Sequence, residues 1–334
     1  MSVPPLALTM GDPAGIGPEL TLAAWERLRG GHPFAVIADP DHLAALAASL
    51  GREVPVRAVE TLAEAASIFP TALPVLPEPL PTPAVPGRPD PAHAEAIVSS
   101  VRRAVALARA GAAAAVVTNP LAKTTLLEAG IGHAGHTLWL KELAGGGTPV
   151  MMLAGPMLRA VPVTVHIPLA EVPRALSRAA IVTAGRVAAA SLASDFGLTA
   201  PRLAVAALNP HAGESGTVGR EEIEVIVPAI EELRAEGIDA TGPHPADSLF
   251  HAAARATYDA VLCMYHDQAL IPVKALDFAH AVNVTLGLPI VRTSPDHGTA
   301  YGLAGRGVAD ATSLIAALTL AALIAARRSE RQAV

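Results

Sequence analysis

The segment Arg202–Glu214, R-L-A-V-A-A-L-N-P-H-A-G-E, joins a short apolar run of strand length to a polar turn that contains His211. The same arrangement occurs in V-H-I-P-L around His166 and in M-Y-H-D-Q around His266. Apolar runs of this kind alternate with alanine-rich helical stretches along the chain, which is the βαβ pattern of a mostly parallel sheet. We therefore expect an α/β fold.

The expected elements follow this alternation. Strands are expected at Leu6–Met10, Phe34–Ala38, Ala113–Val117, Val161–Val165, Leu203–Ala207 and Ala260–Met264, with an extended stretch at Val282–Val291. Helices are expected at Leu20–Arg29, Asp41–Leu50, Ala94–Ala110, Thr124–Ala129, Leu138–Leu143, Thr312–Arg327, and around Glu171–Phe196 and Glu221–Glu236. Nine prolines in Pro70–Pro91 predict a surface excursion without regular structure, with a domain linker as the alternative.

Composition excludes several classes of protein. The chain has 334 residues, 51% of them hydrophobic, which is enough for one large or two ordinary domains. A net charge of -6 without a basic run argues against nucleic acid or an anionic membrane as the main partner. The single cysteine, Cys263, lies in an apolar run and is expected to be a buried small hydrophobe.

No targeting or membrane signal is expected at either end of the chain. The N-terminus has no cationic region, and Asp12 comes early, so no signal peptide is expected. The apolar stretch Ser313–Ala326 is too short for a membrane span and reads as a core or dimer-interface helix. We expect a cytoplasmic protein.

The three histidines are candidate metal ligands. Ligands in open α/β sheets gather at the carboxyl ends of strands, where each of these histidines is expected to lie. Three neutral imidazoles at one place make a divalent-metal site with an open coordination position. Asp247, in H-P-A-D-S-L, and Asp267, next to His266, are candidate extra ligands or hydrogen-bond partners of the ligands. The alternative is that each histidine is a hydrogen-bonded structural residue.

A second group of polar residues suits an anionic substrate. An ammonium, an amide and a guanidinium group follow the third histidine, at Lys274, Asn283 and Arg292. Together they suit a phosphate or a carboxylate, although each could instead pair with a nearby acid. The G-H-T sequence places His136 and Thr137 in a loop of small residues, where they could bond a substrate oxygen.

The segment Gly11–Glu19, G-D-P-A-G-I-G-P-E, is a glycine-rich turn between a strand and a helix. Pro18 suits a first helical position, and the backbone N–H groups of the turn could face an anion. The glycine order is not that of a Rossmann fingerprint, although Asp39 after the second strand resembles its ribose-binding acid. A tight turn without a ligand is the alternative.

Eight ordered motifs resemble the 4-hydroxythreonine-4-phosphate dehydrogenase family of vitamin B6 synthesis. They run from Met10 to Ala300: M-G-D-P-A-G-I-G-P-E, G-H-T, H-I-P-L, N-P-H-A-G-E, P-A-D-S-L-F, Y-H-D-Q, N-V-T-L-G-L-P-I-V-R-T-S and D-H-G-T-A. The resemblance implies two α/β/α domains around a central cleft, related to isocitrate and isopropylmalate dehydrogenases. The expected domains are residues 1–125 with 283–334 on the cofactor side, and residues 126–282 on the metal and dimer side.

The resemblance also implies roles for residues at matching positions. The three histidines resemble the family's divalent-metal ligands, with zinc, cobalt or magnesium as candidates. The residues that resemble its substrate contacts are His136, Thr137, Lys274, Asn283 and Arg292. Related dehydrogenases hold the nucleotide with a loop that resembles His297, Gly298, Thr299 and Ala300 of this chain. We expect Gly15 and Gly17 to be further cofactor contacts. The cofactor would be NAD or NADP, and the active site would be shared across a homodimer.

The implied reaction is the oxidation of 4-phosphooxy-L-threonine to 2-amino-3-oxo-4-phosphooxybutanoate, which decarboxylates to 3-amino-2-oxopropyl phosphate. The metal would favour the alkoxide as hydride leaves and would then polarise the new ketone. Lys274, Asp247 and His136 are all candidate proton acceptors. Alternatives are a sister dehydrogenase acting on a phosphorylated four-carbon sugar acid or an aromatic cis-diol dicarboxylate, and a metal-dependent hydrolase or aldolase. A non-catalytic binding protein fits least well.

Overall fold

The computed structural model describes residues 3–122, 124, 127, 130 and 136–332. The chain forms two compact units, Met1–Pro149 with Leu288–Val334, and Val150–Gly287. The boundaries between these units lie at 149/150 and 287/288, whereas the approximate boundaries expected from the sequence are 125/126 and 282/283. Segment 126–149 goes with the first unit because helix α6 (His136–Ala144) packs against α4 (Ala94–Arg109). The assignment of cofactor and metal sides to the two domains stays a prediction.

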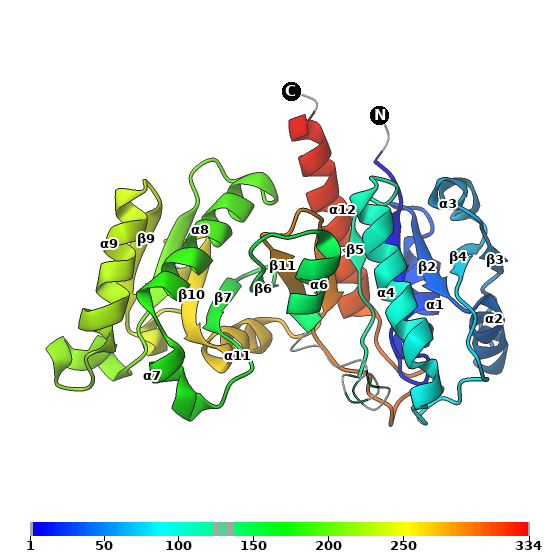
Figure 1. The fold of residues 1–334 in the computed structure, drawn as a ribbon, viewed down its shortest axis with the longest axis horizontal. Helices are drawn as coiled ribbons and strands as arrows, with labels where there is room; N and C mark the ends of the chain where they lie inside the picture. The colour runs from blue at the N-terminus through cyan, green and yellow to red at the C-terminus, as the bar shows by residue number, and fades with distance from the viewer. Residues whose placement is uncertain (1–2, 123, 125–126, 128–129, 131–135, 333–334) are drawn as a thin grey trace. The chain divides into compact units, whose positions relative to one another are not determined.

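The first unit is built on a parallel sheet with the strand order β3-β4-β2-β1-β5-β12. Its strands are β1 (Leu6–Thr9), β2 (Phe34–Ala38), β3 (Val56–Ala58), β4 (Leu73–Pro77), β5 (Val116–Val117) and β12 (Arg292–Pro295). Its other helices are α1 (Gly17–Leu28), α2 (Pro40–Ser49), α3 (Leu62–Ile68), the short η1 (Pro91–His93) and α12 (Thr312–Gln332). Helices α4 and α12 both pack against β1 and β5, whose side chains are buried (Figure 1).

Local sequence fixes several helix starts in this unit. Asp39 caps α2 by accepting hydrogen bonds from the backbone N–H groups of Asp41 and His42. Thr61 caps α3 by accepting from the N–H of Glu64, while the Glu64 carboxylate accepts from the N–H of Glu60, one residue before the position used in a capping box. Each side chain satisfies backbone donors that a helix start leaves without an intrahelical partner.

The expectation that Pro70–Pro91 lacks regular structure is wrong in part. Strand β4 (Leu73–Pro77) lies within it and pairs in parallel with β2 and β3. Leu73, Val75 and Leu76 are buried. Their burial favours the strand even though the prolines in L-P-V-L-P cannot donate to the ladder.

The second unit has a mixed sheet with the strand order β11-β6-β7-β10-β8-β9. Its strands are β6 (Val150–Ala154), β7 (Arg159–Thr164), β8 (Arg202–Ala206), β9 (Asp239–His244), β10 (Ala260–Tyr265) and β11 (Val282–Leu286). Strand β6 is antiparallel to both β7 and β11, whereas β7, β10, β8 and β9 pair in parallel. Parallel β7, β10 and β8 are neighbours, so the turns at their carboxyl ends share one edge of the sheet.

Helices and short turns complete the second unit (Figure 1). They are η2 (Leu169–Glu171), α7 (Val172–Ala175), α8 (Arg178–Ser194), η3 (Pro210–Gly216), the short π-helix η4 (Glu222–Ile226), α9 (Val227–Ala235), η5 (Ala246–Ser248), α10 (Ala252–Arg255) and α11 (His266–Leu276). Helices α8 and α11 both pack against β7 and β10. Cys263 is fully buried in this core, as expected, and burial raises the pKa of its thiol well above the ordinary value.

Helix α12 is longer than the sequence predicts. By length and composition alone, Thr312–Arg331 could cross a membrane, the one such segment in the part of the chain that the structure describes. Its Leu314, Leu318 and Ile324 side chains are buried, and the helix packs against β12 and α1. It therefore serves as a core helix.

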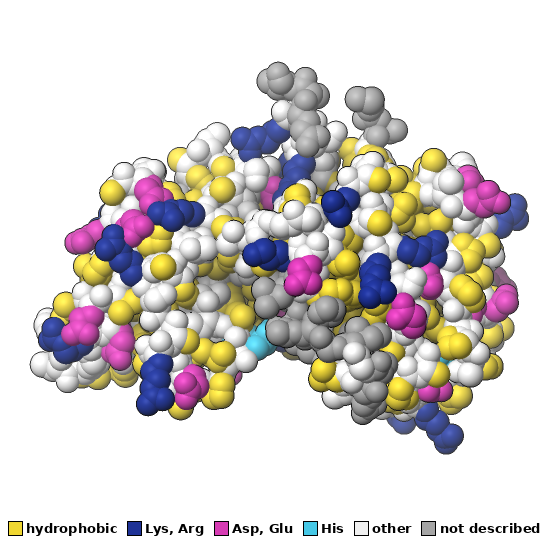
Figure 2. All heavy atoms as spheres, in the orientation of Figure 1, with side chains coloured by type: hydrophobic (Ala, Val, Ile, Leu, Met, Phe, Trp, Pro, Cys, Tyr) yellow, Lys and Arg dark blue, Asp and Glu magenta, His cyan; other side chains and the backbone are white. Residues whose placement is uncertain are grey.

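Acidic and basic side chains are interspersed on the face shown in Figure 2, as the modest net charge of -6 would suggest.

Candidate active site

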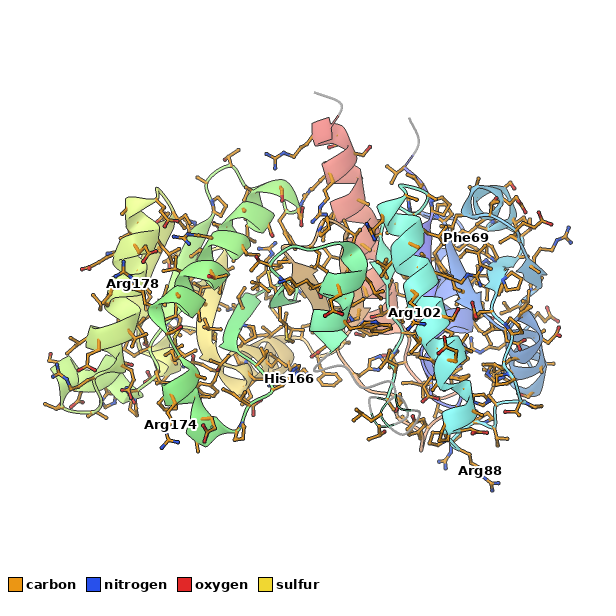
Figure 3. All side chains as sticks on the ribbon, in the orientation of Figure 1. Phe69, Arg88, Arg102, His166, Arg174 and Arg178 are labelled. Atoms are coloured by element: carbon orange, nitrogen blue, oxygen red, sulfur yellow. The ribbon has the colours of Figure 1, made fainter. Side chains whose placement is uncertain are left out.

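The three histidines follow three adjacent parallel strands of the second unit. His166 comes two residues after β7, His211 lies in the turn after β8, and His266 begins α11 directly after β10. The ring centroids of His166 and His266 are 5.7 Å apart, with an angle of 44° between the ring planes. His166 is labelled in Figure 3. The fold therefore brings the first and third histidines together at the strand ends.

Two of these histidines have an unusual backbone. The φ angle is 54° at His166 and 52° at His211, in the left-handed region that favours glycine. The left-handed backbone continues through Ser215, giving five such residues in a row. Consecutive left-handed residues other than glycine are unfavourable, and such strain persists only where surrounding contacts enforce it, often at functional sites.

Carboxylates hold the Nδ1 atoms of two histidines. Nδ1 of His266 donates to Oδ1 of Asp267 at 2.7 Å, and Nδ1 of His211 donates to Oε1 of Glu214 at 2.5 Å. Because an ionised carboxylate only accepts, each bond fixes the ring so that Nε2 faces away from the carboxylate. The bond to Glu214, its negative charge and that of Asp247 raise the pKa of His211. Carboxylate–imidazole pairs of this kind commonly orient metal ligands.

A hollow of about 240 Å³ opens beside the histidine pair. It is lined by Thr164, His166, Ile167, Leu169, Val172, Tyr265, His266 and Asp267. Apolar walls with a few convergent polar groups are typical of small-molecule sites.

The structure brings two of the three predicted metal ligands close together. Among the described residues, no three His, Cys, Asp or Glu side chains lie close enough together to hold a metal ion. His166 and His266 pair, whereas His211, 69% exposed at its side chain, is not part of a three-member group. Two imidazoles with a carboxylate on one Nδ1 atom fit part of a divalent-ion ligand set. The three-histidine site stays a prediction.

The predicted substrate contacts are divided between the two units. In the second unit, Lys274 is half-buried on α11, with Nζ 5.4 Å from the centroid of the Phe278 ring, and Asn283 is half-buried on β11. In the first unit, Arg292 is buried on β12, and its Nη2 donates to Oγ1 of Thr118 at 2.7 Å. Burial lowers the pKa of Arg292 to about 10, so it remains a cation at neutral pH.

The other predicted substrate contacts, His136 and Thr137, begin α6 in the first unit. Their side chains lie outside what the structure describes.

The candidate cofactor segments meet each other within the first unit. The N–H of Ile16 donates to the carbonyl of Thr299 at 2.9 Å, and a Cβ added at Gly15 would lie 2.9 Å from that carbonyl oxygen. The Tyr301 hydroxyl donates to Oδ2 of Asp12 at 2.6 Å, which ties the glycine-rich turn to the segment after His297–Ala300. Gly15 allows the close approach because it has no side chain.

His297 carries a further polar atom within these loops. Its Nε2 is buried and has no hydrogen-bond partner among the residues that the structure describes, whereas Gly298 has open space where a side chain would begin. A buried imidazole nitrogen of this kind offers a hydrogen bond to a ligand, as expected of a nucleotide contact.

Asp39 does not fit the ribose-binding interpretation. Its Oδ1 caps α2, and its Oδ2 accepts from the N–H of Leu80 at 2.9 Å. Both carboxylate oxygens of Asp39 therefore accept hydrogen bonds from the backbone of the folded chain. This agrees with the glycine order, which already argued against a Rossmann fingerprint.

Sequence reasoning missed three partners of the candidate site residues. They are Glu214 for His211, Thr118 for Arg292, and Tyr301 for Asp12. The Glu214 partner could have been predicted from the sequence, since Glu214 stands three residues after His211 in the N-P-H-A-G-E motif. The other two pairs are 174 and 289 residues apart, and only the fold brings them together.

By its fold, the protein is of the mixed α/β class, with candidate site residues at strand ends in both units. Its family follows from comparison: a family model described as "Pyridoxal phosphate biosynthetic protein PdxA" matches residues 31–321. The chain belongs to this family.

Similar proteins and solved structures are named 4-hydroxythreonine-4-phosphate dehydrogenase. The chain is 57% identical to 4-hydroxythreonine-4-phosphate dehydrogenase of Caulobacter vibrioides, over 98% of this chain and 99% of that protein. A crystal structure of the Klebsiella pneumoniae enzyme of that name is 39% identical, with a TM-score of 0.88 over 96% of this chain and 99% of that one. The predicted family, mixed α/β fold and dehydrogenase class are therefore confirmed.

A more distant solved structure bears on the alternatives. A terephthalate 1,2-cis-dihydrodioldehydrogenase from Burkholderia xenovorans is 29% identical, with a TM-score of 0.65 over 95% of this chain and 97% of that one. The same architecture thus occurs in a dehydrogenase with a different name.

Proposed function

We propose that this protein oxidises 4-phosphooxy-L-threonine with NAD or NADP in pyridoxine 5'-phosphate biosynthesis. The product, 2-amino-3-oxo-4-phosphooxybutanoate, loses CO2 to give 3-amino-2-oxopropyl phosphate. Relatives as similar as 57% over nearly the whole chain carry the name of this dehydrogenase. The observation that carries the proposal is the pair of imidazoles, His166 and His266, whose centroids lie 5.7 Å apart at neighbouring strand ends.

These imidazoles would hold one divalent ion, zinc, cobalt or magnesium, with His211 as the third ligand. Nδ1 of His266 and of His211 is engaged by a carboxylate, so Nε2 is the ligating atom of each. When bound, the ion supplies positive charge that stabilises the negative charge developing on the substrate oxygen. Because three imidazoles are neutral, the charge of the ion would not be cancelled by its ligands.

His211 stands apart from the histidine pair, which favours an active site shared between two copies of the chain. The elements that carry His166 and His266 also expose apolar side chains: Leu169 is 67% exposed, Ile271 63% and Phe278, just after α11, 64%. Exposed apolar side chains near a site are typical of a protein interface. A homodimer could therefore bring in the third ligand from the second copy.

The remaining candidate residues would bind and orient the reactants. Lys274, Asn283 and Arg292 would hold the phosphorylated end, with His136 and Thr137 as further substrate contacts. Gly15, Gly17, His297, Gly298, Thr299 and Ala300 would contact the cofactor. For the proton acceptor, Lys274, Asp247 and His136 all remain candidates. The protein would work in the cytoplasm, without nucleic acid or membrane.

The test is anaerobic incubation with 4-phosphooxy-L-threonine and NAD, with and without a chelator, while NADH and CO2 are measured. We expect both products, and we expect both to disappear with the chelator. Substrate loss without NADH would favour a metal-dependent hydrolase or aldolase on the same histidines.

A second candidate function is a sister dehydrogenase reaction. The structural neighbour at TM-score 0.65 is named for an aromatic cis-dihydrodiol, which favours oxidation of an aromatic cis-diol dicarboxylate. A phosphorylated four-carbon sugar acid is the other alternative substrate. Comparing kcat/KM for the three purified substrates would separate these reactions.

A further inference from the structure

We propose that Glu222 is a positioning residue for His211. Its buried carboxylate holds the N-P-H-A-G-E turn, so that Nε2 of His211 is presented to the metal ion. This inference rests on the proposed function, because it requires His211 to be a metal ligand.

The first observation is how Glu222 binds the start of the turn. The residue is 3% exposed, and its Oε1 accepts from the backbone N–H groups of Leu208 at 2.9 Å and Asn209 at 2.7 Å. These are the last two N–H groups before Pro210 and His211, because proline has none. Charge-assisted hydrogen bonds in a buried setting are stronger than neutral ones, so they fix the point from which the turn begins.

The second observation is a clamp on the Asn209 side chain. Its Nδ2 donates to Oε2 of Glu222 at 2.9 Å and to Oε2 of Glu221 at 2.7 Å. Both hydrogens of the amide are therefore used by carboxylates, which leaves Asn209 one orientation. The backbone and the side chain of the residue two positions before His211 are thus both held.

The third observation is that Glu222 also contacts the far side of the turn. Gly213, two residues after His211, has φ at 76°, and a Cβ added there would lie 2.6 Å from Oε2 of Glu222. The left-handed run from His211 to Ser215 is locally unfavourable, so it needs tertiary contacts to persist. Glu222 supplies such contacts before and after His211.

The fourth observation is the backbone that carries Glu222. Residues Glu222–Ile226 form a short π-helix directly before α9, and π-helical segments are rare and frequently occur at functional sites. Glu222 accepts three hydrogen bonds from Leu208 and Asn209, just before His211. Glu224 on the same helical turn is exposed and pairs with Arg220 at 2.5 Å. The two glutamates differ in environment but not in chemistry.

The experiment compares Glu222→Gln with the matched control Glu224→Gln in the full chain. Glutamine keeps the size of the side chain, but its Nε2 cannot accept from Asn209. After chelator treatment, each protein is titrated with Co²⁺ and followed by visible absorption, a signature of the ligand geometry. We expect Glu222→Gln to weaken Co²⁺ binding about tenfold to a hundredfold and to change the spectrum, and Glu224→Gln to bind within about twofold of the original protein.

Activity provides a second measurement. Excess metal should restore much of kcat in Glu222→Gln, and KM for NAD should stay unchanged, because the cofactor loops lie in the other unit. Unchanged Co²⁺ affinity and spectrum in a folded Glu222→Gln protein would overturn the proposal. If that variant does not fold, Asn209→Ala, which removes the clamped amide, decides in the same way.

His211→Ala separates the two levels of the argument. If it leaves Co²⁺ binding unchanged, the proposed metal site fails and the role of Glu222 fails with it. If it weakens Co²⁺ binding while Glu222→Gln and Asn209→Ala do not, only the positioning role is overturned.

Discussion

The candidate cofactor loops of the first unit and the histidine turns of the second are held in different ways. In the loops, a main-chain bond joins the two segments directly, from the N–H of Ile16 to the carbonyl of Thr299 at 2.9 Å, and the bond from Tyr301 to Asp12 adds to it. In the turns, side chains dominate: carboxylates hold His211 and His266, and the backbone at His166 and His211 is strained. Both regions lie at the carboxyl ends of strands.

This difference indicates how each region would recognise its ligand. A loop shaped by its backbone tolerates changes of side chain but not an added Cβ where two segments touch. A turn that presents imidazoles depends on those side chains and on the carboxylates behind them. Substitutions in the turns should therefore reduce kcat and metal binding, whereas substitutions in the loops should affect stability and cofactor binding.

The largest expected effect comes from removing an imidazole. His266→Ala should lower kcat about a thousandfold, because several kcal/mol of charge stabilisation would be lost. NADH formation with saturating substrate and metal measures this. The control is His251→Ala, an exposed histidine just before α10 that is not a predicted metal ligand, which should keep the original rate. A near-normal rate in His266→Ala would contradict the proposed metal site.

Arg292→Lys should have the second-largest effect, on KM for the phosphorylated substrate. The guanidinium of Arg292 is buried and fixed by Thr118, and lysine cannot reproduce its forked donors. We expect KM for the phosphorylated substrate to rise about tenfold to a hundredfold, as the loss of a charge-assisted hydrogen bond implies. Arg202→Lys, at an exposed arginine of the second unit, is the control. Equal KM values in both variants would remove Arg292 from the substrate site.

Gly15→Ala tests the contact between the cofactor loops. The new Cβ would lie 2.9 Å from the carbonyl oxygen of Thr299, so one loop must move. We expect a loss of about 1–3 kcal/mol in the free energy of unfolding and a higher KM for NAD, with kcat less affected. Gly30→Ala is the matched control, because nothing lies within 4 Å of a Cβ at that position. Similar urea midpoints for the two variants would contradict the close approach.

Tyr301→Phe should have a smaller effect in the same region. It removes the hydrogen bond to Asp12, which contributes about 1 kcal/mol and ties one loop to the other. We expect a modest loss of stability together with a raised KM for NAD. Tyr258→Phe removes a comparable buried bond, to the Leu249 carbonyl in the second unit, and should lower stability without changing that KM. The same KM in both variants would show that the tie does not matter for cofactor binding.

The smallest effect concerns acid stability. Hydrogen bonds and the positive charge of Arg202 lower the pKa of Asp259, which lies just before β10. A carboxyl group with a lowered folded-state pKa stabilises the fold above its unfolded pKa of about 4, and this is lost as pH falls through the folded value. Urea unfolding of Asp259→Asn and the original protein should therefore converge below pH 4. A constant difference throughout the range would contradict the lowered pKa.

Much of the fold could be predicted from local patterns. Apolar runs located β2, β8 and β10 closely, because a strand buried on both faces needs consecutive apolar side chains. Strand β4 was missed since its prolines outweighed three buried side chains in the prediction. The antiparallel direction of β6 could not be predicted, because the direction of a strand depends on its neighbours and not on its own residues.

The candidate site was predictable as a set of residues but not as an arrangement. Residue type and position after a strand singled out the three histidines. The left-handed backbone that carries His211 and the close approach of His166 to His266 are indicated by no pattern in the sequence. The same holds for Arg292 on β12 and Thr118 just after the neighbouring β5, which are distant in the chain and joined by a hydrogen bond.

The order of apolar runs, turns and polar motifs determined the fold class and the family, because these depend on which side chains can be buried and which chemistry they carry. Only the tertiary structure decided which strand ends meet, which carboxylate holds which imidazole, and where the backbone is strained. Those properties arise from contacts between distant segments, whose energies appear only when the whole chain has packed.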